Sequence, residues 1–244
     1  MNFKMMQTYF KMRFRSKETK VVIVLLIIYS SLAYFAPNIL SLTAWGENPK
    51  FYLANYASFF FWFAALFFVL PLYVVYLQPN ENYFSNLNVI CRFEGFVKYW
   101  YVRVKIAFLD SSLFVLFLYA LMLIRAAYFH QFHHYIENAA FFLKSCCIQI
   151  LAFTLFALLC AFFSTIFNKP ILGFTCAYLL YAYDFIASNM GLLPIHMLNA
   201  ISVRPEDSVL YWLTFLMVAA LIMIFTALGP IILNHKNRIQ KERL

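Results

Sequence analysis

The chain has 244 residues, of which 64% are hydrophobic and 12% are charged, and its net charge is +9. An ordinary soluble domain is about half apolar and a quarter charged, so this composition excludes a soluble globular protein and requires the bilayer as solvent. In a soluble protein the positive charge would suggest nucleic acid as a partner, but here its placement along the chain indicates membrane topology instead.

The first predicted element is an amphipathic helix over residues 1–20. Its apolar residues recur at helical spacing, at Phe3, Met6, Phe10 and Phe14. Lys4, Lys11 and Arg15 share another face, which is typical of a helix that lies in the membrane interface with its cations at the headgroups. The alternative is a disordered basic tail that only sets topology. Ser16 or Thr19 is expected to separate this segment from the first membrane span.

Apolar runs of about 20 residues predict an all-α transmembrane domain over residues 21–233. The six expected spans cover residues 21–41, 54–77, 105–124, 145–167, 171–188 and 209–233. Fifteen of the 19 Lys and Arg residues fall on one side of these spans when both chain termini are placed there. The positive-inside rule therefore places both termini, including a basic tail over 234–244, in the cytoplasm.

Two connecting segments differ from ordinary loops. The expected cytoplasmic loop 78–104 is rich in aromatic residues, and its apolar spacing is compatible with a short helix on the membrane face or with a surface that docks another protein. The outer segment 189–208 is moderately apolar and is interrupted by Gly191, Pro194 and Pro205. It is expected to hold short helices against the outer mouth of the bundle or a re-entrant turn.

Two carboxylates lie within expected spans, Asp110 in the third and Asp184 in the fifth. Intramembrane carboxylates are costly and usually face protein or water. Each therefore has two interpretations that the sequence leaves open. One is a polar point on a translocation path or a proton site, and the other is a buried hydrogen-bond partner or a residue that reaches the interface.

The chain lacks the motifs of common catalytic sites. It has five glycines and no phosphate-binding G-x-x-x-x-G-K-[ST] loop, no G-x-S-x-G and no H-E-x-x-H, so no enzyme activity, cofactor or metal site is expected. His130, His134 and Glu137 would share one helix face and could hold zinc, but isolated histidine-containing loops are far commoner. The five cysteines show no paired ligand spacing and are interpreted as reduced.

This layout resembles the membrane subunit of an ABC exporter of the ABC-2 (type V) kind. The resemblance rests on the basic N-terminal helix, the six spans with both ends inside, and the segment between spans five and six. It also rests on Arg92, Gly95, Trp100 and Lys105, which fit a loose R-x-x-[GS]-x-x-x-x-W-x-x-x-x-K pattern leading into the third span. Without a large outer domain, the chain looks most like the compact permeases with which Gram-positive bacteria export or resist peptides, including bacteriocins and phenol-soluble modulins.

The resemblance implies a dimer, formed with itself or with a sister permease, in the bacterial plasma membrane. Separate ATPase subunits would bind ATP and Mg²⁺ and dock on the coupling loop within 78–104. The residues that the resemblance assigns to docking are Asn88, Arg92, Phe93, Glu94, Phe96 and Val97. The substrate is expected to be an amphipathic or hydrophobic peptide. The alternatives are the small-ligand-binding six-span module of a vitamin importer and an integral membrane metalloenzyme.

Overall fold

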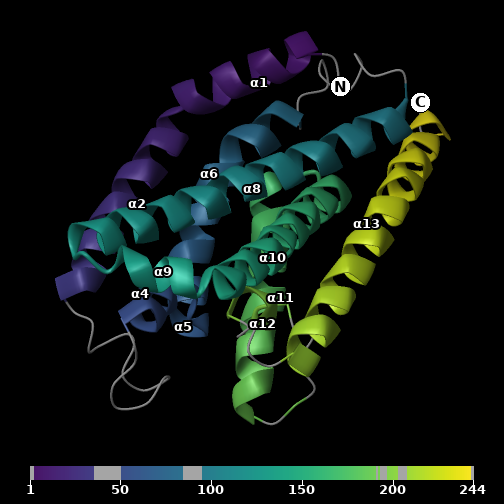
Figure 1. Cartoon of the computed structure of the whole chain (residues 1–244). Helices are drawn as coiled ribbons and strands as arrows, with labels where there is room; N and C mark the ends of the chain where they lie inside the picture. Colours follow the sequence, from purple (N-terminus) through teal and green to yellow (C-terminus); the bar gives the residue numbers. More distant parts are fainter. Residues whose placement is uncertain are drawn as a thin grey trace.

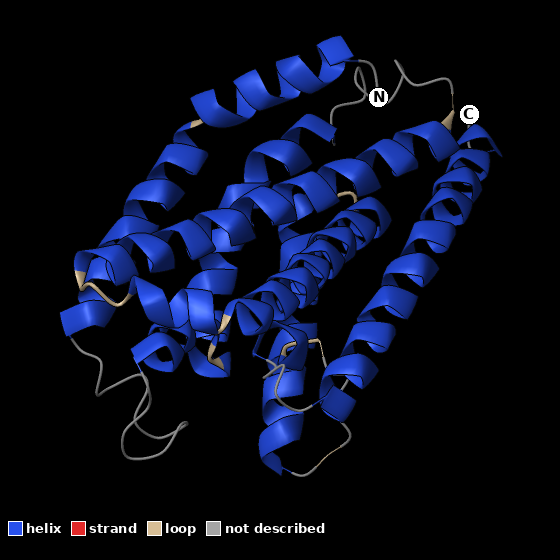
Figure 2. Ribbon diagram, in the orientation of Figure 1, coloured by secondary structure: helices blue, strands red, loops and turns tan. Residues whose placement is uncertain are grey.

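The computed structural model describes residues 3–35, 51–84, 95–190, 192, 197–202 and 208–242. All regular secondary structure in these ranges is helical, as Figure 2 shows. Five stretches are long and apolar enough to cross a membrane, namely Asn55–Phe84, Phe96–Tyr128, Ala139–Phe167, Pro170–Ala187 and Ser208–His235. The prediction of a helical multi-pass membrane protein is therefore confirmed. The sixth span, predicted over 21–41, lies partly outside the described residues and stays a prediction.

The N-terminal segment forms two helices, α1 (Phe3–Arg15) and α2 (Lys17–Phe35). Ser16 separates them, and its hydroxyl oxygen accepts a hydrogen bond from the backbone N–H of Thr19 at 3.2 Å. A serine just before a helix stabilises its first turn in this way, because the first amides have no partner within the helix. The break at Ser16 makes α1 a separate element, which lies along the upper edge of the molecule in Figure 1. The location of α1 in the membrane interface remains a prediction.

The stretch from residue 51 to 84 is an irregular helix. It comprises α4 (Phe51–Phe60), α5 (Trp62–Ala64), the π-helix η1 (Ala65–Val69) and α6 (Leu70–Phe84). Phe61 has extended backbone angles between α4 and α5. Two tyrosines from other helices donate to carbonyls in this region, Tyr29 to Ser58 at 2.5 Å and Tyr178 to Leu66 at 3.2 Å. Such donors are required where a membrane helix departs from regular geometry.

Helix α8 (Phe96–Tyr128) is longer than the span predicted at 105–124. Its 33 residues extend about 50 Å, well beyond the roughly 30 Å hydrocarbon core. The segment 78–104, predicted as a loop, therefore differs in the structure: α6 continues to Phe84, and α8 already begins at Phe96. Trp100, which belongs to the loose motif that leads into the third predicted span, is fully buried. Residues 85–94 lie outside the described part of the chain.

The remaining helices are α9 (Phe132–Glu137), α10 (Ala139–Phe167), α11 (Pro170–Met190), α12 (Asn199–Ser202) and α13 (Ser208–Glu242). The turn between α10 and α11 is tight because Asn168 adopts a left-handed conformation with φ 56° and Pro170 opens the next helix. Asparagine tolerates that conformation, and proline is favoured at a first helical position.

Helix α10 lies at the centre of the bundle, and α13 lies at its periphery. In α10, 72% of the most apolar stretch is buried, whereas 17% of the most apolar stretch of α13 is buried. The start of α1 and the end of α13 lie on the same side of the molecule (Figure 1). On α13, exposed apolar side chains include Trp212, Leu216 and Met223. A face of this kind suits lipid or a second membrane chain.

Candidate functional site

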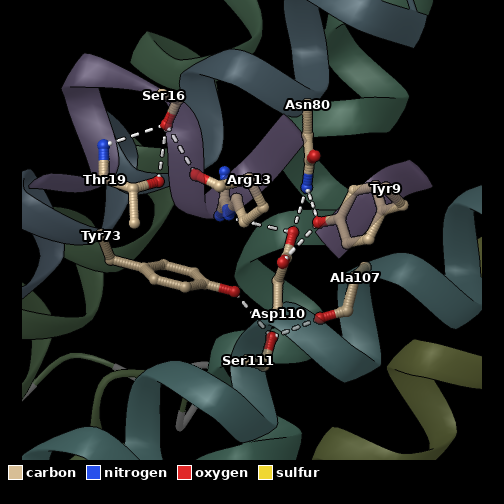
Figure 3. A network of polar contacts seen from close by, with 9 residues as sticks. All are labelled: Tyr9, Arg13, Ser16, Thr19, Tyr73, Asn80, Ala107, Asp110 and Ser111. Atoms are coloured by element: carbon tan, nitrogen blue, oxygen red, sulfur yellow. Dashed lines mark hydrogen bonds and ion pairs between the residues drawn. The ribbon is translucent and has the colours of Figure 1, made fainter. Parts of the chain in front are cut away.

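The strongest candidate site is a buried cluster that joins α1 to α6 and α8. At its centre is Asp110 on α8, which is fully buried. Tyr9 on α1 donates its hydroxyl to Oδ1 of Asp110 at 2.5 Å, and the amide nitrogen of Asn80 on α6 donates to Oδ2. The same amide donates to the Tyr9 hydroxyl at 2.7 Å. Figure 3 shows the side chains of Tyr9 and Asn80 converging on the Asp110 carboxylate.

Arg13 supplies the positive charge of this cluster. It follows Tyr9 by one helical turn, is also fully buried, and places Nη2 3.4 Å from Oδ2 of Asp110. Its guanidinium carbon lies 3.6 Å from the ring centre of Tyr76, a cation–π contact with α6. Removing a partner from such a pair would leave an uncompensated charge in a medium of low dielectric constant. The pair therefore holds α1 against the bundle through charge as well as packing.

The protonation states of the two α1 side chains suit these roles. Burial, reinforced by the neighbouring Asp110 carboxylate, raises the pKa of the Tyr9 phenol above its usual value, so Tyr9 remains a donor. Burial alone would lower the pKa of Arg13, but the Asp110 carboxylate opposes this effect and the net shift is upward. Arg13 is consequently a permanent cation in its buried position.

A second buried ion pair lies beside the first. Arg103 on α8 directs Nη2 toward both carboxylate oxygens of Glu81 on α6, at 2.6 and 2.5 Å. Its Nη1 donates to the Thr165 hydroxyl on α10 at 3.2 Å. Asn80, which binds Asp110, and Glu81, which binds Arg103, are adjacent on α6. Their two partners lie about two turns apart on α8. We call the six residues Tyr9, Arg13, Asn80, Glu81, Arg103 and Asp110 the polar cluster.

A different set of polar contacts fixes the segment after α11. The buried Asp184 on α11 accepts a hydrogen bond from the backbone N–H of Leu198 at 2.9 Å. Gln149 on α10 donates to the carbonyl of Ile201 at 3.0 Å, and its side-chain oxygen accepts from Tyr119 at 2.9 Å. These contacts tie α12, within the predicted outer segment 189–208, to the middle of the bundle.

The predicted site residues fall into three groups according to where the structure places them. Asn88, Arg92, Phe93 and Glu94 lie outside the described residues. Phe96 and Val97 form the first turn of α8, with Phe96 half-buried and Val97 exposed. Asp110 and Asp184 are both buried hydrogen-bond partners, and they belong to the two separate sets of contacts described above. A role for either carboxylate in a translocation path stays a prediction.

Sequence reasoning missed most of the polar cluster. Arg13 was counted among the basic residues on the cytoplasmic side, and Glu81 and Arg103 were placed in a loop. A usable signal was the one-turn spacing of Tyr9 and Arg13, which puts both on one face of α1. No comparable signal pairs Glu81 with Arg103, because 22 residues separate them and only the packing of α6 on α8 brings them together.

Metal binding gains no support from the described residues. No group of three or more His, Cys, Asp and Glu side chains in these ranges is arranged to hold an ion. His134 Nδ1 is 3.4 Å from a Glu137 carboxylate oxygen, and 37% of the His134 side chain and 64% of the Glu137 side chain are exposed. Comparisons with known proteins identify no relationship, since no family model, no curated protein and no solved structure matches the chain.

Proposed function

We propose that this chain is the transmembrane permease subunit of an ATP-driven ABC exporter in the bacterial plasma membrane. Its substrate would be an amphipathic or hydrophobic peptide, such as a toxin or bacteriocin. A dimer of permeases would form the pathway, and separate ATPase subunits would supply hydrolysis. The composition and the five apolar helices support a membrane role. The sequence has no phosphate-binding loop, so in this proposal a partner would bind the ATP.

The observation that carries this proposal is the attachment of α1 to the two helices that flank the expected docking segment. Residues 85–94 connect the end of α6 to the start of α8. Asp110 binds Arg13 and Asn80, and Arg103 binds Glu81, so α1, α6 and α8 are joined near that connection. A force applied to the docking segment would therefore move three helices together, which is what coupling to an ATPase requires.

The first test is to purify the tagged chain in mild detergent from its native host and to identify proteins that copurify. We expect an ABC ATPase, and Arg92→Glu or Glu94→Arg should lower ATP hydrolysis by the complex. Lys144→Glu is the matched control, because Lys144 is exposed and lies in a segment predicted to be on the opposite side of the membrane. Normal hydrolysis in both docking variants would contradict the assignment of the docking segment.

The substrate class needs a separate measurement. Amphipathic peptides should stimulate ATP hydrolysis by the complex in proteoliposomes. Stimulation by a lipid or a small drug, with no response to any peptide, would refute the peptide assignment while leaving the permease assignment in place.

A further inference from the structure

A small cavity lies beside the Glu81–Arg103 ion pair of the polar cluster. Its volume is about 20 Å³, and its polar lining consists of Asn80, Glu81 and Arg103. All three side chains are at least nine-tenths buried. Leu77 and Phe84 line the apolar part, and both are also buried. This volume exceeds the 10–15 Å³ or so that one water molecule needs and is far below that of a pocket for an organic ligand.

The amide of Asn80, a residue that lines this cavity, leaves one strong acceptor unused. An ionised carboxylate accepts hydrogen bonds and donates none, so the amide nitrogen of Asn80 must be the atom that faces Asp110. Its oxygen, Oδ1, then points away from Asp110 and has no hydrogen-bond partner among the described residues. A buried amide oxygen without a partner costs about 1–3 kcal/mol.

We infer that this cavity is a binding site for a single ordered water molecule that connects the two ion pairs. The water donates one hydrogen bond to Oδ1 of Asn80 and the other to the carboxylate of Glu81. Asn80, Glu81 and Arg103 provide the two to four polar partners that buried water requires. A metal cation does not suit the same space, because the guanidinium of Arg103 lines it and already neutralises Glu81.

The inference extends the polar cluster from two ion pairs to one continuous network. Asp110 binds Asn80, the water joins Asn80 to Glu81, and Glu81 binds Arg103. Figure 3 shows the half of this network that surrounds Asp110. This conclusion is independent of the transport function, since it concerns the packing of α6, α8 and α10 in any role that the chain has.

A pair of substitutions distinguishes a hydrated cavity from a dry one. Ala157 on α10 lines the cavity, and Ser and Cys are close in size but differ in hydrogen-bonding strength. In a hydrated cavity, the hydroxyl introduced by A157S retains a polar partner for Asn80, whereas the thiol introduced by A157C displaces the water without replacing its bonds. We expect A157C to melt about 2–4 °C below both A157S and the wild type in detergent, the shift for about 1 kcal/mol in a chain of this size.

Ala177 on α11 is the matched control, because it is fully buried within the main apolar core. There, the apolar thiol should be tolerated at least as well as the hydroxyl. If A157C melts at or above the wild type, the thiol fills empty space and displaces no bound water, so the cavity is dry and the inference is wrong.

A second measurement needs no substitution. X-ray radiolysis generates hydroxyl radicals from bound water, and these radicals label adjacent side chains even when bulk solvent cannot reach them. Phe84 lines the cavity and is 2% exposed, while Phe153 is buried in the main core. Labelling of Phe84 at doses that leave Phe153 unmodified supports the water site. Equal absence of label at Phe84 and Leu77 overturns it.

Discussion

Exchanging Arg13 for methionine tests the ion pair that holds α1 in place. The substitution keeps much of the length of the side chain, removes its charge, and leaves the buried Asp110 carboxylate with Tyr9 and Asn80 as its donors. Breaking one side of a buried pair costs about 3–5 kcal/mol, and the lost contact with the Tyr76 ring adds up to about 2 kcal/mol.

For a chain of this length, each kcal/mol lowers the melting temperature by about 2–4 °C. Arg13→Met should therefore melt at least about 6 °C below the wild type when the melting of detergent-solubilised protein is followed by size-exclusion chromatography. Arg15→Met is the matched control, since Arg15 is exposed two residues further along the same helix. Its effect should stay within about 0.5 kcal/mol, which is usual for a surface substitution.

The double variant Arg13→Met/Asp110→Asn decides whether charge is the cause. An asparagine side chain at this position still accepts and donates hydrogen bonds but carries no charge, so it needs no cation nearby. The double variant should lose less stability than the sum of the two single variants. Strict additivity, or a loss from Arg13→Met no larger than that from Arg15→Met, would refute the argument that a buried ion pair fixes α1.

Two further predictions concern helix packing and the segment after α11. A Cβ at Gly229 would overlap the indole ring of Trp100. Gly229→Ala should therefore force α13 away from α8 and lower the melting temperature by an amount equivalent to about 1–3 kcal/mol. An unchanged melting temperature would show that the contact adjusts freely. Asp184→Ala removes the acceptor for the backbone amide of Leu198. Hydrogen exchange at that amide, measured by mass spectrometry, should become about tenfold faster or more, because a hydrogen bond to a charged group contributes about 1.5–3 kcal/mol. Unchanged exchange at Leu198 would mean that packing, and not Asp184, holds α12.

The transmembrane class of the protein could be predicted because it depends on composition and on apolar run length, both of which are local properties. The same holds for the separation of α1 from α2 at Ser16, where a short polar side chain satisfies amides of the next helix. The ends of α6 and α8 were placed less well. Polar and charged residues within 78–104 suggested a loop, but Glu81 and Arg103 neutralise each other inside the bundle, so helices persist through both positions.

The sequence by itself determined that Asp110 lies in an apolar span and that protein or water must compensate its cost there, because a lone carboxylate in a low-dielectric medium is too costly to leave without either. Only the tertiary structure decided which partners it has. Arg13 and Tyr9 lie about 100 residues away in the chain and reach Asp110 because α1 packs across α6 and α8. A charged residue in an apolar span needs compensation because of its own position in the chain. Which residue compensates it depends on how the helices pack, and spacing along the chain does not encode that packing directly.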